Sequence, residues 1–93
     1  MIINRNMTTL TLDSLKIGDR ARIAAIDWER LADGEASRLR HFGFDEGVAV
    51  TPLHRGPFGA DPLAVRVGRM TVAIRRVHAR AVQVVPEGVR SPA

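Results

Sequence analysis

The sequence contains no cysteine and no tyrosine, and its aromatic residues are one tryptophan and three phenylalanines. Without cysteine the chain has no disulfide, no thiolate metal site and no cysteine nucleophile, so an oxidising compartment is not required and the cytoplasm is the expected location. No apolar run approaches the roughly 20 residues that a membrane-spanning helix needs. Residues 1–6 also lack the apolar core of a signal peptide. These absences favour a cytoplasmic protein.

The size and the charge of the chain set further bounds. Its 93 residues are enough for a single domain. The formal net charge is +4, and all of the 14 basic residues except Lys16 are arginines. The arginines are scattered along the chain, which is typical of a solvated surface. A mild positive excess also steers a protein toward an acidic partner surface or a phosphate backbone.

One helix is predicted before a sharp corner at residues 38–47. Asp33 is a candidate N-cap, and the apolar face of the following ten or so residues includes Ala36 and Leu39. Gly43 suits the C′ position, where a left-handed backbone favours glycine. Phe44, just beyond it, is expected to fold back onto the apolar face.

Alternating apolar and polar residues predict strands at 20–26, 48–54, 63–67, 70–74 and 82–85. Gly68 and Arg69 form the two-residue turn of a hairpin, and Pro52 marks an edge or a bulge. The fold class is therefore mainly β: a small barrel of about five antiparallel strands with one α-helix. We expect an N-terminal extension at 1–9, the barrel domain at 10–85 and a flexible tail at 86–93.

The residues offer little support for catalysis or for a bound metal. The histidines have no ligand spacing on a helix, and a site built from His54, Asp61 and His78 would depend on how the strands align. The acids are scattered in turns and caps, and no pair is set for general acid–base chemistry. We therefore predict no enzyme, no cofactor and no metal site.

The loop between 56 and 63 is the clearest candidate for an interaction. Its two prolines and two glycines fix the backbone, while Phe58 and Leu63 supply apolar surface. Such a loop either accepts a partner segment at low entropic cost or folds plainly onto the end of the barrel. Nucleic-acid binding is an alternative for a small basic barrel, although Phe58 is the sole aromatic residue free for base stacking.

Several short motifs in order resemble the FeoA family, the small cytosolic component of bacterial ferrous iron transport. They extend over residues 10–85 and are Leu12-x-x-Leu15-x-x-Gly18, Arg38-Leu39-x-x-Phe42-Gly43-Phe44-x-x-Gly47, Gly56-Pro57-Phe58-Gly59, Asp61-Pro62-Leu63 and Ala73-Ile74-Arg75-Arg76-x-x-Ala79. This chain departs from the family pattern at Ala60, one residue more than the usual run, and at His78, where an acid is frequent.

The resemblance implies an SH3-like barrel that binds and modulates FeoB, the GTP-hydrolysing ferrous iron permease of the membrane. It implies docking through Leu39 and through Pro57 and Phe58, and we add Leu63 as contact area. Leu39→Asp or Phe58→Asp is then expected to abolish capture of the permease while leaving the fold intact, except that a buried Leu39 would make Leu39→Asp unfold the protein instead. A regulatory barrel that senses metal through His54 or His78 stays open as an alternative, as does the oligomeric state.

Overall fold

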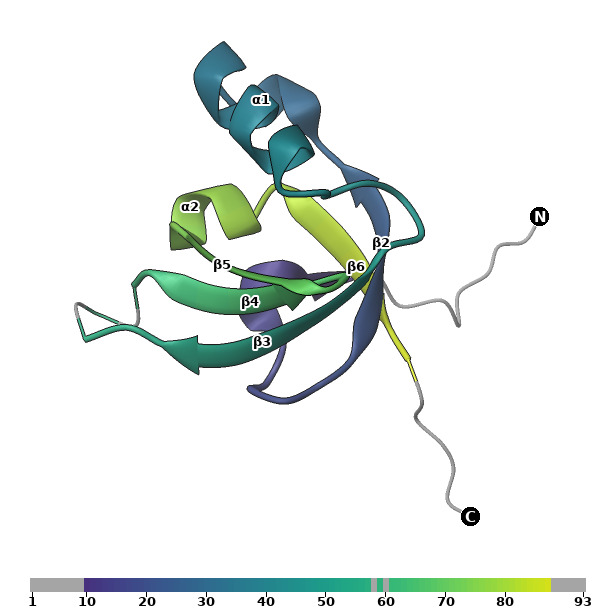
Figure 1. Ribbon diagram of the computed structural model, residues 1–93, viewed down its shortest axis with the longest axis vertical. Coiled ribbons are helices and arrows are strands. Elements are labelled where there is room, and N and C mark those ends of the chain that lie inside the picture. The colour runs from purple at the N-terminus through teal and green to yellow at the C-terminus, as the bar shows by residue number, and fades with distance from the viewer. Residues whose placement is uncertain (1–9, 58, 60, 88–93) are drawn as a thin grey trace.

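One antiparallel sheet of six strands, in the order β1-β6-β2-β3-β4-β5, organises the chain. The computed structural model describes residues 10–57, 59 and 61–87. The strands are β1 (Leu10–Thr11), β2 (Ala21–Ile26), β3 (Ala49–Arg55), β4 (Leu63–Val67), β5 (Met70–Ile74) and β6 (Val82–Pro86), and the helices are α1 (Asp33–His41) and α2 (Arg76–Ala79). Short 3-10 turns at Leu12–Ser14 and Trp28–Arg30 complete the elements. The sheet bends strongly, so that β2 and β6 run across the direction of β3, β4 and β5 (Figure 1).

The predicted hairpin is confirmed. Strands β4 and β5 pair in regular register from Leu63 opposite Ile74 to Val67 opposite Met70. Gly68 opens the turn with φ +57, a conformation that strains a residue with a Cβ. The register of β3 against β4 shifts just after Pro52. This is the predicted bulge, since proline has no N–H to give to the ladder.

The sheet has six strands instead of the predicted five. The additional strand is β1, in which Leu10 lies opposite Val84 and Thr11 lies opposite Gln83. Two residues are too few to show an alternating pattern. Strand β6 also extends through Pro86, and the Arg22 guanidinium lies 2.7 Å from a Glu87 carboxylate oxygen. The ordered sheet therefore extends into the region predicted as tail.

The corner after α1 follows the predicted design, with one correction at the start of the helix. Gly43 has φ +96, its N–H donates to the Arg40 carbonyl, and the Phe44 N–H donates to the Leu39 carbonyl. These two bonds form a Schellman motif, and Leu39 and Phe44 both join the core. The prediction that Asp33 is the N-cap is wrong. The cap residue is Ala32, without a side-chain hydrogen bond, and Asp33 is the first helical residue.

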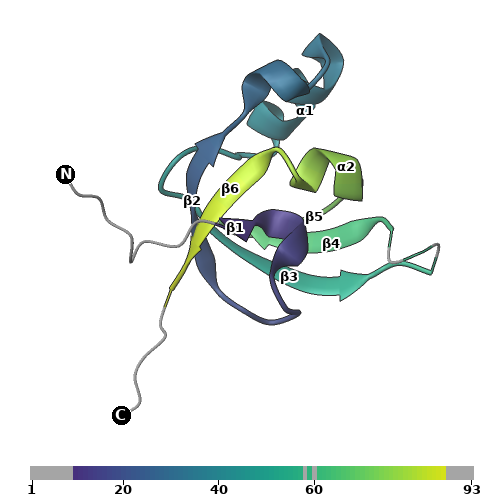
Figure 2. The same cartoon turned by 180° about the vertical axis from the view of Figure 1, so that it is seen from behind.

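The two helices lie at the same end of the sheet. Helix α1 follows β2 and α2 follows β5, and both views place them beside each other (Figures 1 and 2). The core beneath is entirely apolar within the described residues, with Leu12, Val65, Val82 and Val84 at zero exposure. The sheet thus brings the two helices together, and an apolar hollow opens between them.

Candidate functional site: an apolar hollow between the two helices

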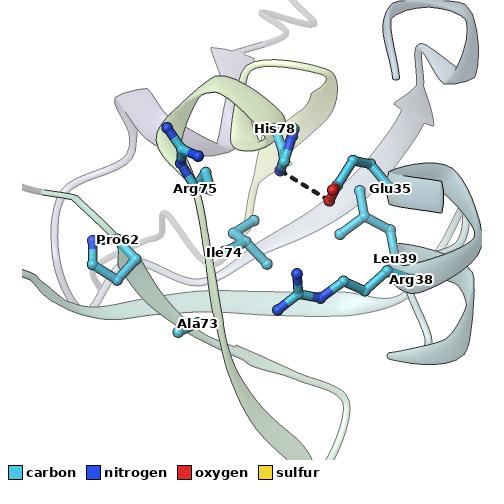
Figure 3. A pocket seen from close by; sticks show the side chains of 8 residues that line it. All are labelled: Glu35, Arg38, Leu39, Pro62, Ala73, Ile74, Arg75 and His78. Carbon is cyan, nitrogen blue, oxygen red and sulfur yellow. Dashed lines mark ion pairs between the residues drawn. The ribbon is translucent and has the colours of Figure 1, made fainter. Parts of the chain in front are cut away.

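A hollow of about 250 Å³ opens between α1 and α2, at the point where β5 ends. Its lining is mostly apolar in area, and the residues come from four separate segments of the chain. They are Glu35, Arg38, Leu39, Pro62, Ala73, Ile74, Arg75 and His78 (Figure 3). Since the α1 residues are far in sequence from Pro62, the end of β5 and α2, the hollow exists only in the folded chain.

The floor of the hollow is built from the core itself. Leu39 is 2% exposed and Ile74 is 5% exposed, so each presents only a small part of its side chain. Ala73 and Pro62 are exposed at the edge of the hollow. An apolar group that enters this space would therefore contact packed side chains on several sides and displace water from apolar surface.

Charged side chains surround the apolar floor. A Glu35 carboxylate oxygen lies 3.4 Å from His78 Nδ1, and this contact joins α1 to α2 across the mouth of the hollow (Figure 3). Arg38 extends from α1 toward Ile74, and Arg75 lies on the other side of Ile74 in this view. Both arginines are exposed. The rim thus carries two guanidinium groups and one acid that is held by an imidazole.

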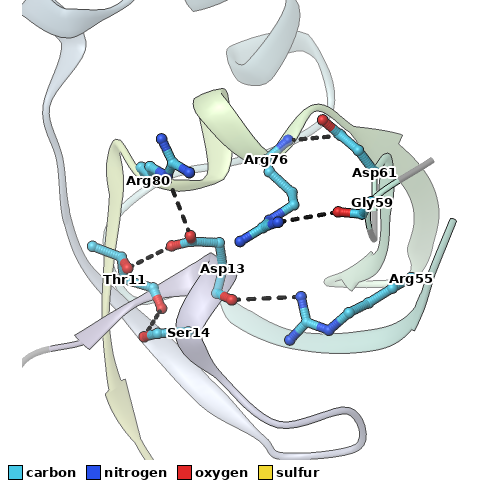
Figure 4. Close-up of polar contacts among 8 residues, drawn as sticks. All are labelled: Thr11, Asp13, Ser14, Arg55, Gly59, Asp61, Arg76 and Arg80. Carbon is cyan, nitrogen blue, oxygen red and sulfur yellow. Dashed lines mark hydrogen bonds and ion pairs between the residues drawn. The ribbon is translucent and has the colours of Figure 1, made fainter.

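A hydrogen-bond network holds the neighbouring loop against α2 (Figure 4). The Arg76 backbone N–H donates to an Asp61 carboxylate oxygen at 3.0 Å, and Arg76 Nη1 donates to the Gly59 carbonyl at 3.1 Å. At the base of the loop the Gly56 N–H donates to the Pro62 carbonyl at 2.8 Å. Pro62 therefore has a fixed position at the edge of the hollow.

The predicted site residues lie in different places. Leu39 lines the floor of the hollow, and Pro57 is exposed in the loop. Phe58 lies outside the described residues. Leu63 has no exposed surface because it is the first residue of β4 and points into the core. The expectation that Leu63 supplies contact area is therefore wrong. Leu63 instead anchors the end of the loop in the core. Partner binding by the others stays a prediction.

Sequence reasoning did not identify the rim. Ala73, Ile74 and Arg75 were recognised only as parts of a motif, and no role followed from it. Glu35 and His78 are far apart in the chain, so no spacing rule connects them. The signal that was present is the pattern of β5, where Ile74 ends an alternating strand directly before a helix.

A second hollow, of about 450 Å³, lies near the C-terminal end of α1. It is lined by Trp28, Arg40, Gly43, Phe44, Asp45 and Val48. The Arg40 guanidinium lies 4.0 Å from the centre of the Trp28 ring, so a cation already covers this aromatic surface. Phe44 is buried in the core. The first hollow is the better candidate because its apolar lining is accessible.

The described part of the chain contains neither a metal-binding cluster nor a helix that could span a membrane. Across residues 10–57, 59 and 61–87, no three histidine, aspartate or glutamate side chains come close enough to hold a metal ion, and the trio His54, Asp61 and His78 does not converge. Asp61 instead caps the start of α2. In the same described ranges, no helix has the length and apolar character needed to cross a bilayer.

The bent six-stranded sheet and the single main helix define a small SH3-like barrel, with an apolar hollow between its two helices. The FeoA domain model matches residues 10–86. The chain therefore belongs to the FeoA domain family, which is associated with ferrous iron transport. Among proteins of curated function, none matches the sequence significantly.

Solved structures of the family agree with this assignment. The FeoA protein of Chlorobium tepidum is 27% identical with a TM-score of 0.76, covering 88% of this chain and 74% of that chain. The FeoA of Stenotrophomonas maltophilia, complexed with zinc and described as an SH3 domain protein, is 35% identical with a TM-score of 0.69, covering 81% and 88%.

The same fold also occurs within a longer protein. The structure of T. acidophilum IdeR is 23% identical with a TM-score of 0.70, covering 85% of this chain but only 34% of that chain. At this level of identity the match concerns the fold alone. The predicted SH3-like barrel and membership of the FeoA family are thus confirmed.

Proposed function

We propose that this protein is a cytoplasmic accessory of bacterial ferrous iron transport that binds the cytosolic part of the FeoB permease and modulates it. The family's association with ferrous iron transport supports the pathway. The observation that carries the binding mode is the apolar hollow of about 250 Å³ between α1 and α2. In this proposal an apolar side chain of FeoB enters the hollow, and the loop with Pro57 and Phe58 contacts the FeoB surface next to that side chain.

The construction of the hollow favours docking at low cost. Its walls belong to a helix on the core, the end of a paired strand and a loop tied to α2 by Asp61 and Arg76. A surface that is already ordered loses little conformational entropy on binding. Apolar area removed from water then contributes roughly 25 cal/mol per Å² toward affinity, before the general costs of association.

Ala73→Glu tests this binding mode. Ala73 is exposed and lines the hollow, so a longer acidic side chain fits the free protein without disturbing the core. On docking, the longer side chain would occupy space that the entering apolar group needs, and its carboxylate would lose water even beside Arg38 and Arg75, which is costly. We expect binding of the purified cytosolic region of FeoB, measured by isothermal titration calorimetry, to weaken about 100-fold or more, which corresponds to about 2.8 kcal/mol.

Thr71→Glu is the matched control. Thr71 is exposed on the same strand, two residues from Ala73 and on the same face, but it does not line the hollow. It introduces the same charge and should leave the affinity within about twofold. Full binding by a folded Ala73→Glu variant would exclude the hollow as the docking site. An absence of binding by the wild type would overturn the proposed function itself.

A further inference from the structure

We infer that the segment received by the hollow is acidic: one apolar side chain enters the space between α1 and α2, and carboxylates next to it in the partner meet Arg38 and Arg75. This inference deepens the proposed function and rests on it for the identity of the partner. The charge on the rim provides the argument, because an apolar floor alone does not distinguish one hydrophobic segment from another.

Arg38 and Arg75 line the hollow and differ from Arg22 and Arg80 in what surrounds them. The Arg22 guanidinium lies 2.7 Å from a Glu87 carboxylate, and that of Arg80 lies 3.4 Å from Asp13. Among the described residues, Arg38 and Arg75 have no ion pair and no side-chain hydrogen bond. Arg38 only lies over the Phe42 ring, at 5.6 Å from its centre. Both guanidinium groups can therefore accept a carboxylate without breaking an existing pair.

The one acid that lines the hollow is already engaged. Glu35 contacts His78 Nδ1 at 3.4 Å, and both side chains are largely buried, at 35% and 20% exposure. The contact places the imidazole directly beside the carboxylate, where a proton carried on Nδ1 would face it. The repulsion that Glu35 would exert on an acidic segment is thereby reduced. The two arginines of the rim attract anionic groups, and the negative charge of Glu35 opposes this attraction only in part.

The overall charge acts in the same direction. A formal net charge of +4 raises the encounter rate with an acidic partner and makes it depend on salt. The binding of a neutral apolar segment would show little such dependence. The salt dependence of the affinity therefore gives a second test of the same inference, since surface charges are screened beyond about 8 Å at physiological ionic strength.

The first experiment measures the affinity of the cytosolic region of FeoB for three neutralised variants. Arg38→Gln and Arg75→Gln should each weaken binding about threefold, and Glu35→Gln should strengthen it about twofold, because exposed charge pairs contribute modestly. Arg69→Gln is the matched control. It removes one positive charge from the exposed β4–β5 turn, at the far end of β5 from the hollow, and should leave the affinity unchanged.

The second experiment uses defined probes. Short synthetic peptides carry a central leucine flanked by glutamates, the same leucine flanked by lysines, or a central glycine flanked by glutamates. They are titrated into isotope-labelled protein, and chemical shifts of Ala73, Ile74 and His78 are followed by NMR. We expect the glutamate-flanked leucine peptide to bind at least about tenfold more tightly than either of the others, with a loss of affinity at high salt.

The possible results separate the inference from the proposed function. Equal binding of the glutamate and lysine peptides, or equal binding with and without leucine, would overturn the acidic apolar segment. Tighter binding of a random-sequence DNA oligonucleotide through the same arginines would overturn it in favour of phosphate recognition. If FeoB binding is lost in Ala73→Glu but is unchanged in Arg38→Gln and Arg75→Gln, the hollow is the docking site and the inference of an acidic segment is wrong. If the acidic peptide binds and FeoB does not, the proposal that FeoB is the partner is wrong instead.

Discussion

The substitution Leu39→Asp is expected to unfold the protein, and not to produce a folded chain that fails to bind its partner. Leu39 is 2% exposed and packs in the core with Phe44. Its backbone carbonyl also accepts the hydrogen bond that ends α1. A carboxylate at this position has no polar partner in an apolar surrounding, so either the charge or the surrounding structure must give way.

The expected magnitude decides the outcome. Removing a buried leucine side chain typically costs about 2–5 kcal/mol, and burying an unpaired charge adds several more. A chain of this length has a free energy of unfolding of about 5–14 kcal/mol. The two costs together are therefore comparable to the whole free energy of unfolding. Circular dichroism and NMR spectra of Leu39→Asp should show an unfolded or strongly destabilised chain.

Leu39→Met provides the control for this prediction. It keeps the volume and apolar character, so it should cost less than about 1.5 kcal/mol and retain the fold. A Leu39→Asp variant that melts at nearly the wild-type temperature would show that the floor of the hollow opens readily to water. Leu39→Asp therefore does not separate partner binding from folding. Substitutions at exposed positions such as Ala73 are the better tests of binding.

Most features that depend on neighbours in sequence were predicted well, with the N-cap at Asp33 as the exception. The β4–β5 hairpin is defined by alternation on both sides of Gly68, and the corner after α1 by Gly43 and Phe44. Each uses a residue whose backbone preference is strong and local. For the same reason Pro52 correctly indicated a bulge in β3.

Features that depend on distant pairing were not predictable in the same way. Strand β1 is defined only by its partner β6, across most of the chain. The contact between Glu35 and His78 arises because the sheet brings α2 beside α1, and neither helix carries a local sign of it. The hollow itself belongs to this class, because it requires that both helices and the loop be placed first.

Leu63 shows how two correct patterns can conflict. The alternation of β4 places Leu63 on the same face as Val65 and Val67, which are all buried. Its position next to a loop rich in proline and glycine suggested exposed apolar surface instead. The pairing of Leu63 opposite Ile74 makes it the first residue of β4, so the strand pattern is the one that applies.

Gly56→Ala is expected to disrupt the base of the loop and, through it, the edge of the hollow. A Cβ at Gly56 would lie 2.6 Å from the Asp61 carbonyl oxygen and 2.8 Å from Pro62 Cδ. The first of these atoms is backbone, so no flexible side chain can move aside. The loop must shift, and the 2.8 Å hydrogen bond from the Gly56 N–H to the Pro62 carbonyl is strained or lost.

Overpacking of this kind costs about 1–3 kcal/mol, which would lower the melting temperature by several degrees for each kcal/mol. Affinity for the cytosolic region of FeoB should also fall, because Pro62 lines the hollow. Differential scanning calorimetry and titration calorimetry measure the two effects on the same sample.

Gly34→Ala is the matched control, since a Cβ there meets nothing within 4 Å and the residue lies in α1. Alanine is favoured over glycine within a helix by up to about 1 kcal/mol, so this variant should be neutral or slightly more stable. If Gly56→Ala also proves neutral in both measurements, the loop accommodates the methyl group, and its position at the hollow is not fixed by the close approach of Gly56 to Asp61. If stability falls while affinity is retained, the loop contributes to the fold, and the hollow alone accounts for docking.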